Sequence, residues 1–297
     1  MSLKLIGKRL RWFSGYFSEK LLLLEGRRMA WQVAQLPAST ELSKAGFGVF
    51  SQHDEDGIIQ FLINHVPVLH KTFIEFGIDN YEESNTRFLL MNDDWQGMVL
   101  DDSPEKIAYV KAQKVSRKWD LQFRSAFVTI ENVNQLLSTS GFDTDLGLLS
   151  IDIDGNDYWV WEAISFLPRI VIVEYNSVLG RDPVSIPYQP DFRRTRAHYS
   201  TLYYGCSLSA LAYLAEKKGY ILAGSNQRGN NAFFVRKDVA TSLPARTAQD
   251  AYVASHFKES RDPRGRPTHL REAERRRLIS HLPVQNVITG QIAPLGT

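Results

Sequence analysis

Side chains that carry oxygen ligands gather at the ends of two apolar runs of the sequence. Asp152 and Asp154 lie at the end of the run 146–153, and Glu174 and Asn176 lie at the end of the next run. Since side chains alternate along a strand, each pair shares one face of its strand. Oxygen ligands at this density suit Mg²⁺ or another divalent cation, with Asp154, Glu174 and Asn176 as candidate ligands. The alternative is a metal-free site in which one carboxylate, first of all Asp154, is the general base.

The segment 148–157 also has the spacing of acids found in calcium-binding loops, because Asp152, Asp154 and Asp157 fall close together. The glutamate that closes such a loop is missing, and an apolar strand leads directly into the segment. We therefore expect a strand end that projects carboxylates into a ligand cleft. Asp152 is a candidate for binding a cofactor there, and Asp157 is a candidate for binding a substrate.

The apolar run 72–76 ends in a turn with a single glycine, Gly77, between Glu75 and Asp79. Because glycine has no Cβ, a ligand can lie against the backbone at this turn. Glu75 or Asp79 could receive an ammonium group, such as that of the methionine part of S-adenosylmethionine (SAM). A dinucleotide site would need three spaced glycines, and two carboxylates would repel phosphates. The turn therefore favours SAM over NAD or ATP.

The next apolar run ends in Asp101, Asp102 and Ser103. An acid at the end of the second strand, about 20 residues past the first turn, typically hydrogen-bonds ribose hydroxyls. Asp101 is the first candidate and Asp102 the second, and Ser103 is also assigned to the cofactor site and to the cap of the following helix. Plain helix capping is the alternative for each acid. Both strand ends together predict a SAM pocket and hence a methyltransferase.

A long segment, residues 177–205, follows the last of these strands and is rich in tyrosine and arginine. Loops of this length inside a compact domain are often lids or binding loops. His198 is the candidate general base, since its pKa permits proton abstraction near neutral pH. Tyrosines suit stacking on sugar rings and arginines suit phosphate or carboxylate groups. The candidates for binding the acceptor in this segment are Tyr188, Arg196, Tyr199 and Tyr203.

The whole chain of 297 residues alternates apolar strands with amphipathic helices from about residue 50 onward. This alternation predicts an α/β fold with a mostly parallel, Rossmann-like sheet, closed by an antiparallel hairpin at 220–236. We expect N-terminal helices over 1–45, the sheet domain over 46–238, and a C-terminal extension over 239–297. The expected strands are 72–76, 97–100, 122–128, 146–153, 170–175, 220–224 and 232–236. The expected helices are 57–69, 83–92, 104–114, 133–140, 157–166, 207–218 and 272–281.

The composition, with 43% hydrophobic and 23% charged residues, is that of a globular protein. Cys206 is the one cysteine, which excludes a disulfide within the chain and fits a reducing, cytoplasmic compartment. We expect no secretory signal, and no apolar run is long enough to span a membrane. The end of the chain, residues 284–295, is expected to be extended and to pack on a partner subunit, as in a homo-oligomer.

The net charge of +2 is unevenly distributed. Residues 1–38 hold seven Lys or Arg and two Glu, whereas the middle of the chain is acidic. An acidic centre with basic ends is not the pattern of a nucleic-acid-binding domain. The basic N-terminus is a candidate for peripheral contact with an anionic membrane or glycan, and solvated helix faces are the alternative.

Four segments, residues 50–57, 75–79, 83–87 and 150–157, taken together resemble the FkbM-type methyltransferases over about residues 50–237. The resemblance implies a class I SAM-dependent fold and O-methylation, commonly of sugar hydroxyls in glycans, glycolipids or natural products. It also implies that the residues after the third strand border the adenine, where Asn132 stands. Gln52 and Ser84, in the matching segments, are further candidates for the cofactor pocket, although Gln52 could equally be a helix cap.

Two other classes of function remain open from the sequence. One is a nucleotide-sugar oxidoreductase, or another small-molecule enzyme, on a similar sheet, and the absent glycine fingerprint disfavours it. The other is a non-catalytic binding protein that keeps the fold and uses its basic ends. Acids at all the expected strand ends disfavour that reading.

Overall fold

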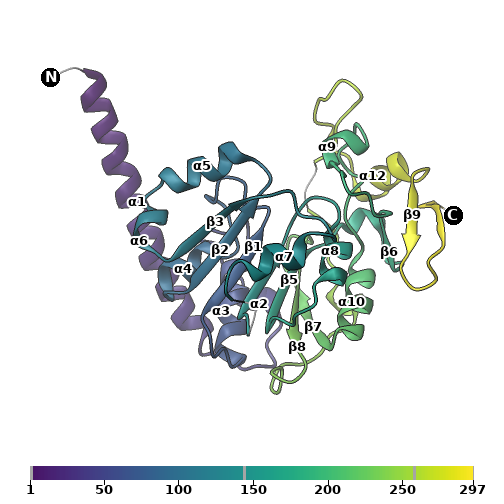
Figure 1. The fold of residues 1–297 in the computed structure, drawn as a ribbon, viewed down its shortest axis with the longest axis horizontal. Coiled ribbons are helices and arrows are strands. Elements are labelled where there is room, and N and C mark those ends of the chain that lie inside the picture. Colours follow the sequence, from purple (N-terminus) through teal and green to yellow (C-terminus); the bar gives the residue numbers. More distant parts are fainter. Residues whose placement is uncertain (1–2, 143–144, 257–258, 297) are drawn as a thin grey trace.

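A computed structural model describes the backbone of residues 3–142, 145–256 and 259–296, with side chains described from Ser18 onward. A seven-stranded sheet forms its centre (Figure 1). In spatial order its strands are β3 (Leu121–Ser125), β2 (Gln96–Asp101), β1 (Thr72–Phe76), β4 (Leu148–Ile151), β5 (Ile170–Glu174), β8 (Asn231–Arg236) and β7 (Tyr220–Ser225).

Strands β1 to β5 are parallel, and β8 runs antiparallel between β5 and β7. The expected α/β class is therefore confirmed, with a mostly parallel Rossmann-like sheet closed by an antiparallel pair. Parallel strands end at the same edge of a sheet, so the carboxyl ends of β1, β2, β4 and β5 lie side by side.

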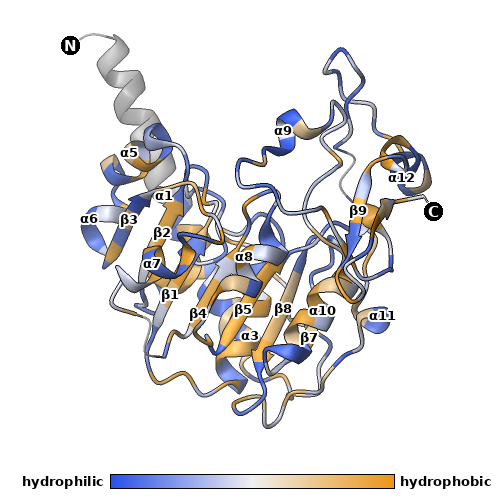
Figure 2. Cartoon of the chain, turned by 45° about the vertical axis from the view of Figure 1, so that its right-hand side comes forward, coloured by the Kyte–Doolittle hydropathy of each residue, from blue (hydrophilic) through white to orange (hydrophobic). Residues whose placement is uncertain are grey.

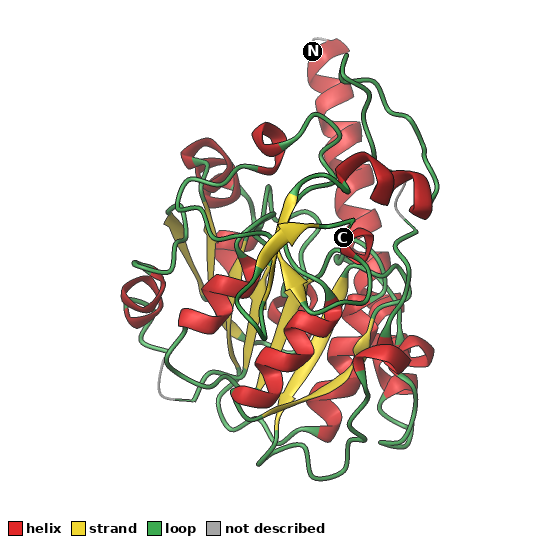
Figure 3. Ribbon diagram, turned by 90° about the vertical axis from the view of Figure 1, so that its right-hand side faces the viewer, coloured by secondary structure: helices red, strands yellow, loops and turns green. Residues whose placement is uncertain are grey.

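Helices cover both faces of the sheet (Figure 3). Successive side chains of β1 divide between two apolar clusters, since Phe73 belongs to one and Ile74 to the other. On the Phe73 face lie α1 (Leu3–Val33), α2 (Leu42–Ala45), α3 (Glu55–His65), α4 (Arg87–Asn92), α5 (Pro104–Ala112) and α6 (Val115–Lys118). On the Ile74 face lie α7 (Val133–Ser138), α8 (Asp157–Ala163) and α10 (Leu208–Lys217). Figure 2 shows the apolar strands enclosed between these layers.

The C-terminal extension forms a second, smaller sheet with a piece of the long segment after β5. Strand β9 (Pro283–Asn286) pairs with β10 (Ile292–Pro294) and with β6 (Val184–Ser185). Helix α12 (Glu272–Ile279) contacts the short 3₁₀ helix η1 (Ser177–Leu179), and α11 (Ala248–Ala251) contacts α10. The terminal residues that were expected on a partner subunit thus pair within their own chain.

The expected N-terminal helices are α1, which is continuous from Leu3 to Val33, and the short α2. Two expected boundaries differ more clearly. Helix α4 begins at Arg87 rather than at residue 83, because the backbone N–H groups of Asn85 and Thr86 are turned toward the Glu75 carboxylate. Strand β3 ends at Ser125, where its pairing with β2 stops. None of the described helices is both long and apolar enough to cross a membrane.

Candidate active site

A cavity of about 820 Å³ lies at the carboxyl ends of β1, β2, β4 and β5. This is within the size range of cavities that bind cofactors and substrates. Many residues singled out in the sequence line it, namely Gln52, Glu75, Gly77, Asp79, Ser84, Asp101, Asp102, Asp152, Asp154, Glu174 and Asn176. Others in the described part of the chain do not line it, namely Ser103, Asn132, Asp157, Tyr188, Arg196, His198, Tyr199 and Tyr203.

Glu75, at the end of β1, is buried and holds the loop that follows. Its carboxylate accepts hydrogen bonds from Ser84 Oγ at 2.6 Å, from Asn85 N at 2.9 Å, and from Thr86. Burial raises the pKa of Glu75, and these donors oppose that rise. Because its oxygens already serve four donors, Glu75 acts on a ligand mainly by fixing this loop, in which Ser84 and Asn85 line the cavity.

Gly77 is required by a close approach of two backbones. Its φ is +75°, and a Cβ built there would lie 1.5 Å from the carbonyl oxygen of Asp152. The glycine therefore lets the turn after β1 pack directly on the end of β4, and it also lines the cavity. The sequence predicts that a ligand lies against the backbone of Gly77. In the structure the carbonyl oxygen of Asp152 also lies close to it.

Asp101, at the end of β2, ties two turns together. Its Oδ2 accepts from Asp79 N at 3.0 Å, and its Oδ1 accepts from Ser103 N at 2.9 Å. A carboxylate oxygen has further lone pairs, so hydroxyl donors can still reach Asp101 from the cavity. Ser103 caps α5, as predicted, through a 3.2 Å bond from Lys106 N. Lys106, which the sequence argument did not use, lies 2.7 Å from Asp79 Oδ1.

The neighbouring part of the cavity joins the ends of β2 and β3. Arg193 forms an ion pair with Asp102 and lies over the Phe127 ring, with 4.4 Å from guanidinium carbon to ring centroid. Asn132 stands outside the cavity lining, where its amide bonds Thr129 N and Phe127 O. The prediction that Asn132 binds a cofactor directly is therefore corrected: it shapes the loop that presents Phe127.

A tightly bonded turn presents Gln52 to the cavity. One carboxylate oxygen of Asp56 accepts from the backbone N–H groups of Val49, Phe50 and Ser51 at 2.6–2.9 Å. Burial raises the pKa of Asp56 to about 7. Gln52 itself is exposed and lines the cavity, so its side chain is free to face a ligand rather than being needed as a helix cap.

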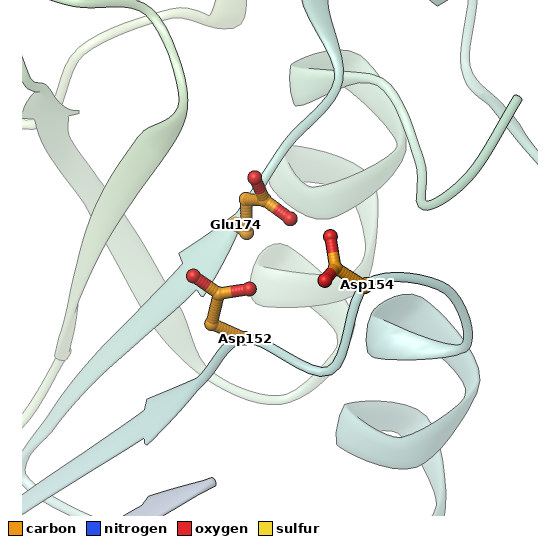
Figure 4. A group of neighbouring side chains, drawn as sticks. All are labelled: Asp152, Asp154 and Glu174. Atoms are coloured by element: carbon orange, nitrogen blue, oxygen red, sulfur yellow. The ribbon is translucent and has the colours of Figure 1, made fainter. Parts of the chain in front are cut away.

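Three carboxylates meet at the ends of β4 and β5. Asp152, Asp154 and Glu174 each place an oxygen within 4.8 Å of the others (Figure 4). Burial and repulsion between them raise the pKa values of Asp152 and Glu174 well above the usual range. Glu174 Oε2 is buried without a hydrogen-bond partner among the described residues. Positive charge nearby therefore favours the ionised form of the cluster.

Arg194 supplies some of that charge. Its Nη1 lies 2.6 Å from Asp154 Oδ1 and its Nη2 lies 3.6 Å from Glu259 Oε2. The guanidinium also lies 3.9 Å above the Tyr204 ring, and the Tyr204 hydroxyl donates to Glu174 Oε1 at 3.4 Å. Arg194 and Tyr204, which both belong to the long segment after β5, thus contact the carboxylate cluster.

Asn176 does not join this cluster through its side chain. Its Nδ2 donates to the carbonyl oxygens of Leu202 and Tyr204 at 2.9 and 3.0 Å, and its Oδ1 accepts from Val178 N at 3.0 Å. Every polar atom of the amide is therefore used within the chain. The candidate ligand set changes from Asp154, Glu174 and Asn176 to Asp152, Asp154 and Glu174.

Asp157 was predicted to contact a substrate, and the structure corrects this. It is fully buried, and its two oxygens accept from Ile153 N at 2.8 Å and Gly155 N at 2.9 Å. Burial raises the pKa of Asp157 to about 6. The residue fixes the tight turn in which Asp154 adopts a φ of +55° and faces the cavity.

His198, the predicted general base, lies outside the cavity lining. Its Nδ1 lies 2.7 Å from Ser200 Oγ, and its ring packs against Tyr199 and His281. Burial and the neighbouring His281 lower its pKa.

The four predicted acceptor residues of the long segment also lie elsewhere. Tyr188 donates to Glu131 Oε2 at 2.8 Å, and Tyr203 donates to Pro283 O within the apolar cluster of the C-terminal extension. Arg196 and Tyr199 are exposed outside the cavity lining. From the same segment, Arg194 and Tyr204 line the cavity instead.

Other lining residues had no signal in the sequence. Arg275, on α12, is 4% exposed, lines the cavity, and donates to Ser255 O at 2.9 Å. Asn231, on β8, lines the cavity and donates to Glu55 Oε1 at 2.9 Å. Asn231 lies on the antiparallel strand β8, and Arg275 lies in the C-terminal extension. The spacing of residues in the sequence does not predict that these segments reach the cavity.

The raised pKa of Glu174 gives a prediction for stability. A carboxyl whose folded pKa lies above its unfolded pKa favours folding most below the unfolded value, near 4, and that contribution is lost as the pH rises through the folded pKa. Glu174→Gln keeps the size and stays neutral. We expect it to stabilise the chain more at pH 8 than at pH 5.

Thermal unfolding of both proteins from pH 5 to pH 8, in the presence of EDTA, measures this effect. The difference between the two melting temperatures should grow with pH. Asp56 titrates in both proteins and cancels in the comparison, whereas Asp152 and Asp157 interact with Glu174 and contribute to the difference. Parallel profiles would show that the ionisation of Glu174 costs the fold nothing.

No protein-family model and no curated protein matches the chain. Among solved structures, a SAM-dependent methyltransferase from Clostridium acetobutylicum is 15% identical over 42% of this chain and 50% of that chain, with a TM-score of 0.32. The N-terminal domain of EvdMO1 with SAH bound is 11% identical over 71% and 93%, with a TM-score of 0.40. An O-methyltransferase from Bacillus cereus in complex with SAH is 11% identical over 54% and 68%, with a TM-score of 0.30.

This chain therefore spans about half the length of the Clostridium protein. At these identities and TM-scores the likenesses carry no argument about activity. The strand order and the geometry of the cavity carry the functional argument instead.

Proposed function

We propose that the chain is a SAM-dependent O-methyltransferase that acts on a hydroxyl group of a sugar-containing acceptor. The strand order β3-β2-β1-β4-β5-β8-β7 is the order of the class I methyltransferase sheet. The observation that carries the proposal is one cavity that joins two sets of groups. A glycine turn and an acid lie at the ends of β1 and β2, and a carboxylate cluster lies at the ends of β4 and β5.

The first set fits SAM. The loop fixed by Glu75 offers Ser84 and Asn85 to an amino-acid moiety, and Asp79 is an exposed acid at the same turn. Asp101 is placed to accept from ribose hydroxyls, as an acid after the second strand usually does. The Phe127 ring suits stacking with a flat base. SAM, when bound, supplies an electrophilic methyl group.

The second set fits the acceptor. An acceptor hydroxyl between Asp154 and Glu174 can lose its proton to one of these carboxylates as its oxygen attacks. Burial and repulsion from the neighbouring carboxylates raise the pKa of Glu174, which suits a general base. Arg194 forms an ion pair with Asp154 beside this position. The displacement is in line with the departing sulfur, so orientation of the hydroxyl supplies much of the rate.

A divalent cation fits the same cluster. Asp152, Asp154 and Glu174 offer three close oxygens, and the buried Glu174 Oε2 has no hydrogen-bond partner among the described residues. These residues would hold Mg²⁺ or a similar ion, which would lower the pKa of an acceptor hydroxyl. Arg194 competes with the ion for Asp154.

Isothermal titration with SAM and SAH tests the cofactor half of the proposal. We expect binding to the wild-type chain and a loss of at least about tenfold in Asp101→Asn, because a hydrogen bond to a charged group is worth about 1.5–3 kcal/mol. Asp120→Asn, an acid outside the cavity lining, is the control. No binding of either ligand to the folded wild-type chain would overturn the assignment.

A further inference from the structure

The described part of α1 has one face on the domain and another left uncovered. The covered face contains Gly26, Ala30 and Val33, which are buried. Gly26 is required there, because a Cβ would lie 2.6 Å from the Phe88 ring and 2.7 Å from Val49. Glu19 adds an ion pair of 3.3 Å to Arg87. The helix is thus fixed to α4 and its neighbours along this face.

The uncovered face carries large apolar side chains. Leu21, Leu24 and Trp31 are 61%, 64% and 69% exposed. They follow one another at spacings of three and seven residues, so they form a single stripe about 15 Å long on a helix. Exposed single leucines are ordinary, whereas a stripe that includes tryptophan on one helix face indicates a binding surface.

Charge indicates what the stripe binds. Arg28 stands between Leu24 and Trp31 on the same side of the helix, and Arg27 stands next to it. Arg28 is paired with Glu25, but an exposed pair of this kind contributes little and leaves both groups in water. Residues 1–38 carry an excess of five positive charges. Leucine and tryptophan beside a surplus of Lys and Arg is the composition of helices that lie in the interface of anionic lipid.

A second copy of the chain fits this face less well. Two stripes packed together would bring two Arg28 side chains and two strongly basic segments side by side. An anionic surface neutralises the same charges.

We propose that α1 is a membrane-docking helix that lays the stripe of Leu21, Leu24 and Trp31 on an anionic lipid surface. The inference is independent of the proposed methyl transfer, because it concerns the opposite face of a helix that does not line the cavity.

Co-sedimentation of the full chain with vesicles tests the proposal. With vesicles of phosphatidylcholine and phosphatidylglycerol in equal parts we expect clear binding, which weakens in 0.5 M NaCl and is at least about tenfold lower with phosphatidylcholine alone. The triple variant Leu21→Glu, Leu24→Glu, Trp31→Glu should lower the partition coefficient at least about tenfold. These side chains are exposed, so the variant should melt within a few degrees of the wild type.

A matched variant carries three glutamates at exposed apolar positions elsewhere, Leu69→Glu, Leu167→Glu and Ile288→Glu. It makes the same change in charge and should bind vesicles nearly as well as the wild type. Equal loss in both triple variants would mean that charge alone matters, and would overturn the docking stripe. Absence of binding, together with a wild-type dimer in sedimentation velocity that the α1 variant dissociates, would assign the face to a second copy instead.

Discussion

Replacing Gly77 by alanine is expected to unfold the chain or to force the end of β4 away from β1. The new methyl carbon would stand 1.5 Å from the carbonyl oxygen of Asp152, a backbone atom that cannot rotate aside. A φ of +75° adds strain for any residue with a Cβ. The cost should exceed about 4 kcal/mol, which lowers the melting temperature by roughly 6 °C or more. Circular dichroism during heating measures it, and SAM titration of any folded fraction should show lost affinity.

Gly219→Ala is the matched control. Gly219 also has a positive φ, of +82°, but a Cβ there meets no atom within 4 Å. Its substitution isolates the backbone strain, which costs about 1–2 kcal/mol. Equal losses for the two variants would show that the contact with Asp152 is not what requires glycine at position 77.

The sheet could be predicted from the sequence because its signal is local. Apolar runs such as Ile170–Glu174 and the turn residues between them mark each parallel strand without reference to the rest of the chain. The predicted boundaries of helices were wrong where a residue distant in the sequence forms hydrogen bonds with the backbone. Residues 83–86 have helical spacing, yet Glu75 draws the N–H groups of Asn85 and Thr86 into a loop. The spacing of apolar residues does not indicate that such hydrogen bonds replace those of a helix.

The site was predictable where it follows strand ends, and not where it depends on loops. Asp101 and Asp154 lie at the end of a strand or in the turn just beyond one, and both line the cavity as expected. His198 and Arg194 lie in the same loop, only four residues apart. Composition gives no way to tell that a single turn of helix brings Arg194 to Asp154 and leaves His198 against His281. Arg275 lies farther still from any motif.

Replacing Asp154 by asparagine is expected to lower methyl transfer by at least about 100-fold, the usual contribution of a general base. Asparagine matches aspartate in size and tolerates the left-handed backbone that Asp154 adopts, with a φ of +55°. The swap therefore removes the charge and leaves the turn held by Asp157 intact. Affinity for SAM should change by less than about threefold, since Asp101 and the loop after β1 are untouched. SAH release with a panel of nucleotide sugars and oligosaccharides as acceptors measures the rate.

Asp94→Asn is the control for this variant, because Asp94 has the same residue type and a φ of +56° but is exposed and outside the cavity lining. It should turn over like the wild type, and an equal loss in both would remove Asp154 from the reaction.

Treatment with EDTA then distinguishes the two roles proposed for the carboxylate cluster, metal binding and general-base catalysis. If a divalent cation is held by Asp152, Asp154 and Glu174, the wild type loses turnover in EDTA and regains it with Mg²⁺. If Asp154 acts alone as the base, turnover is indifferent to EDTA and follows the ionisation of the cluster.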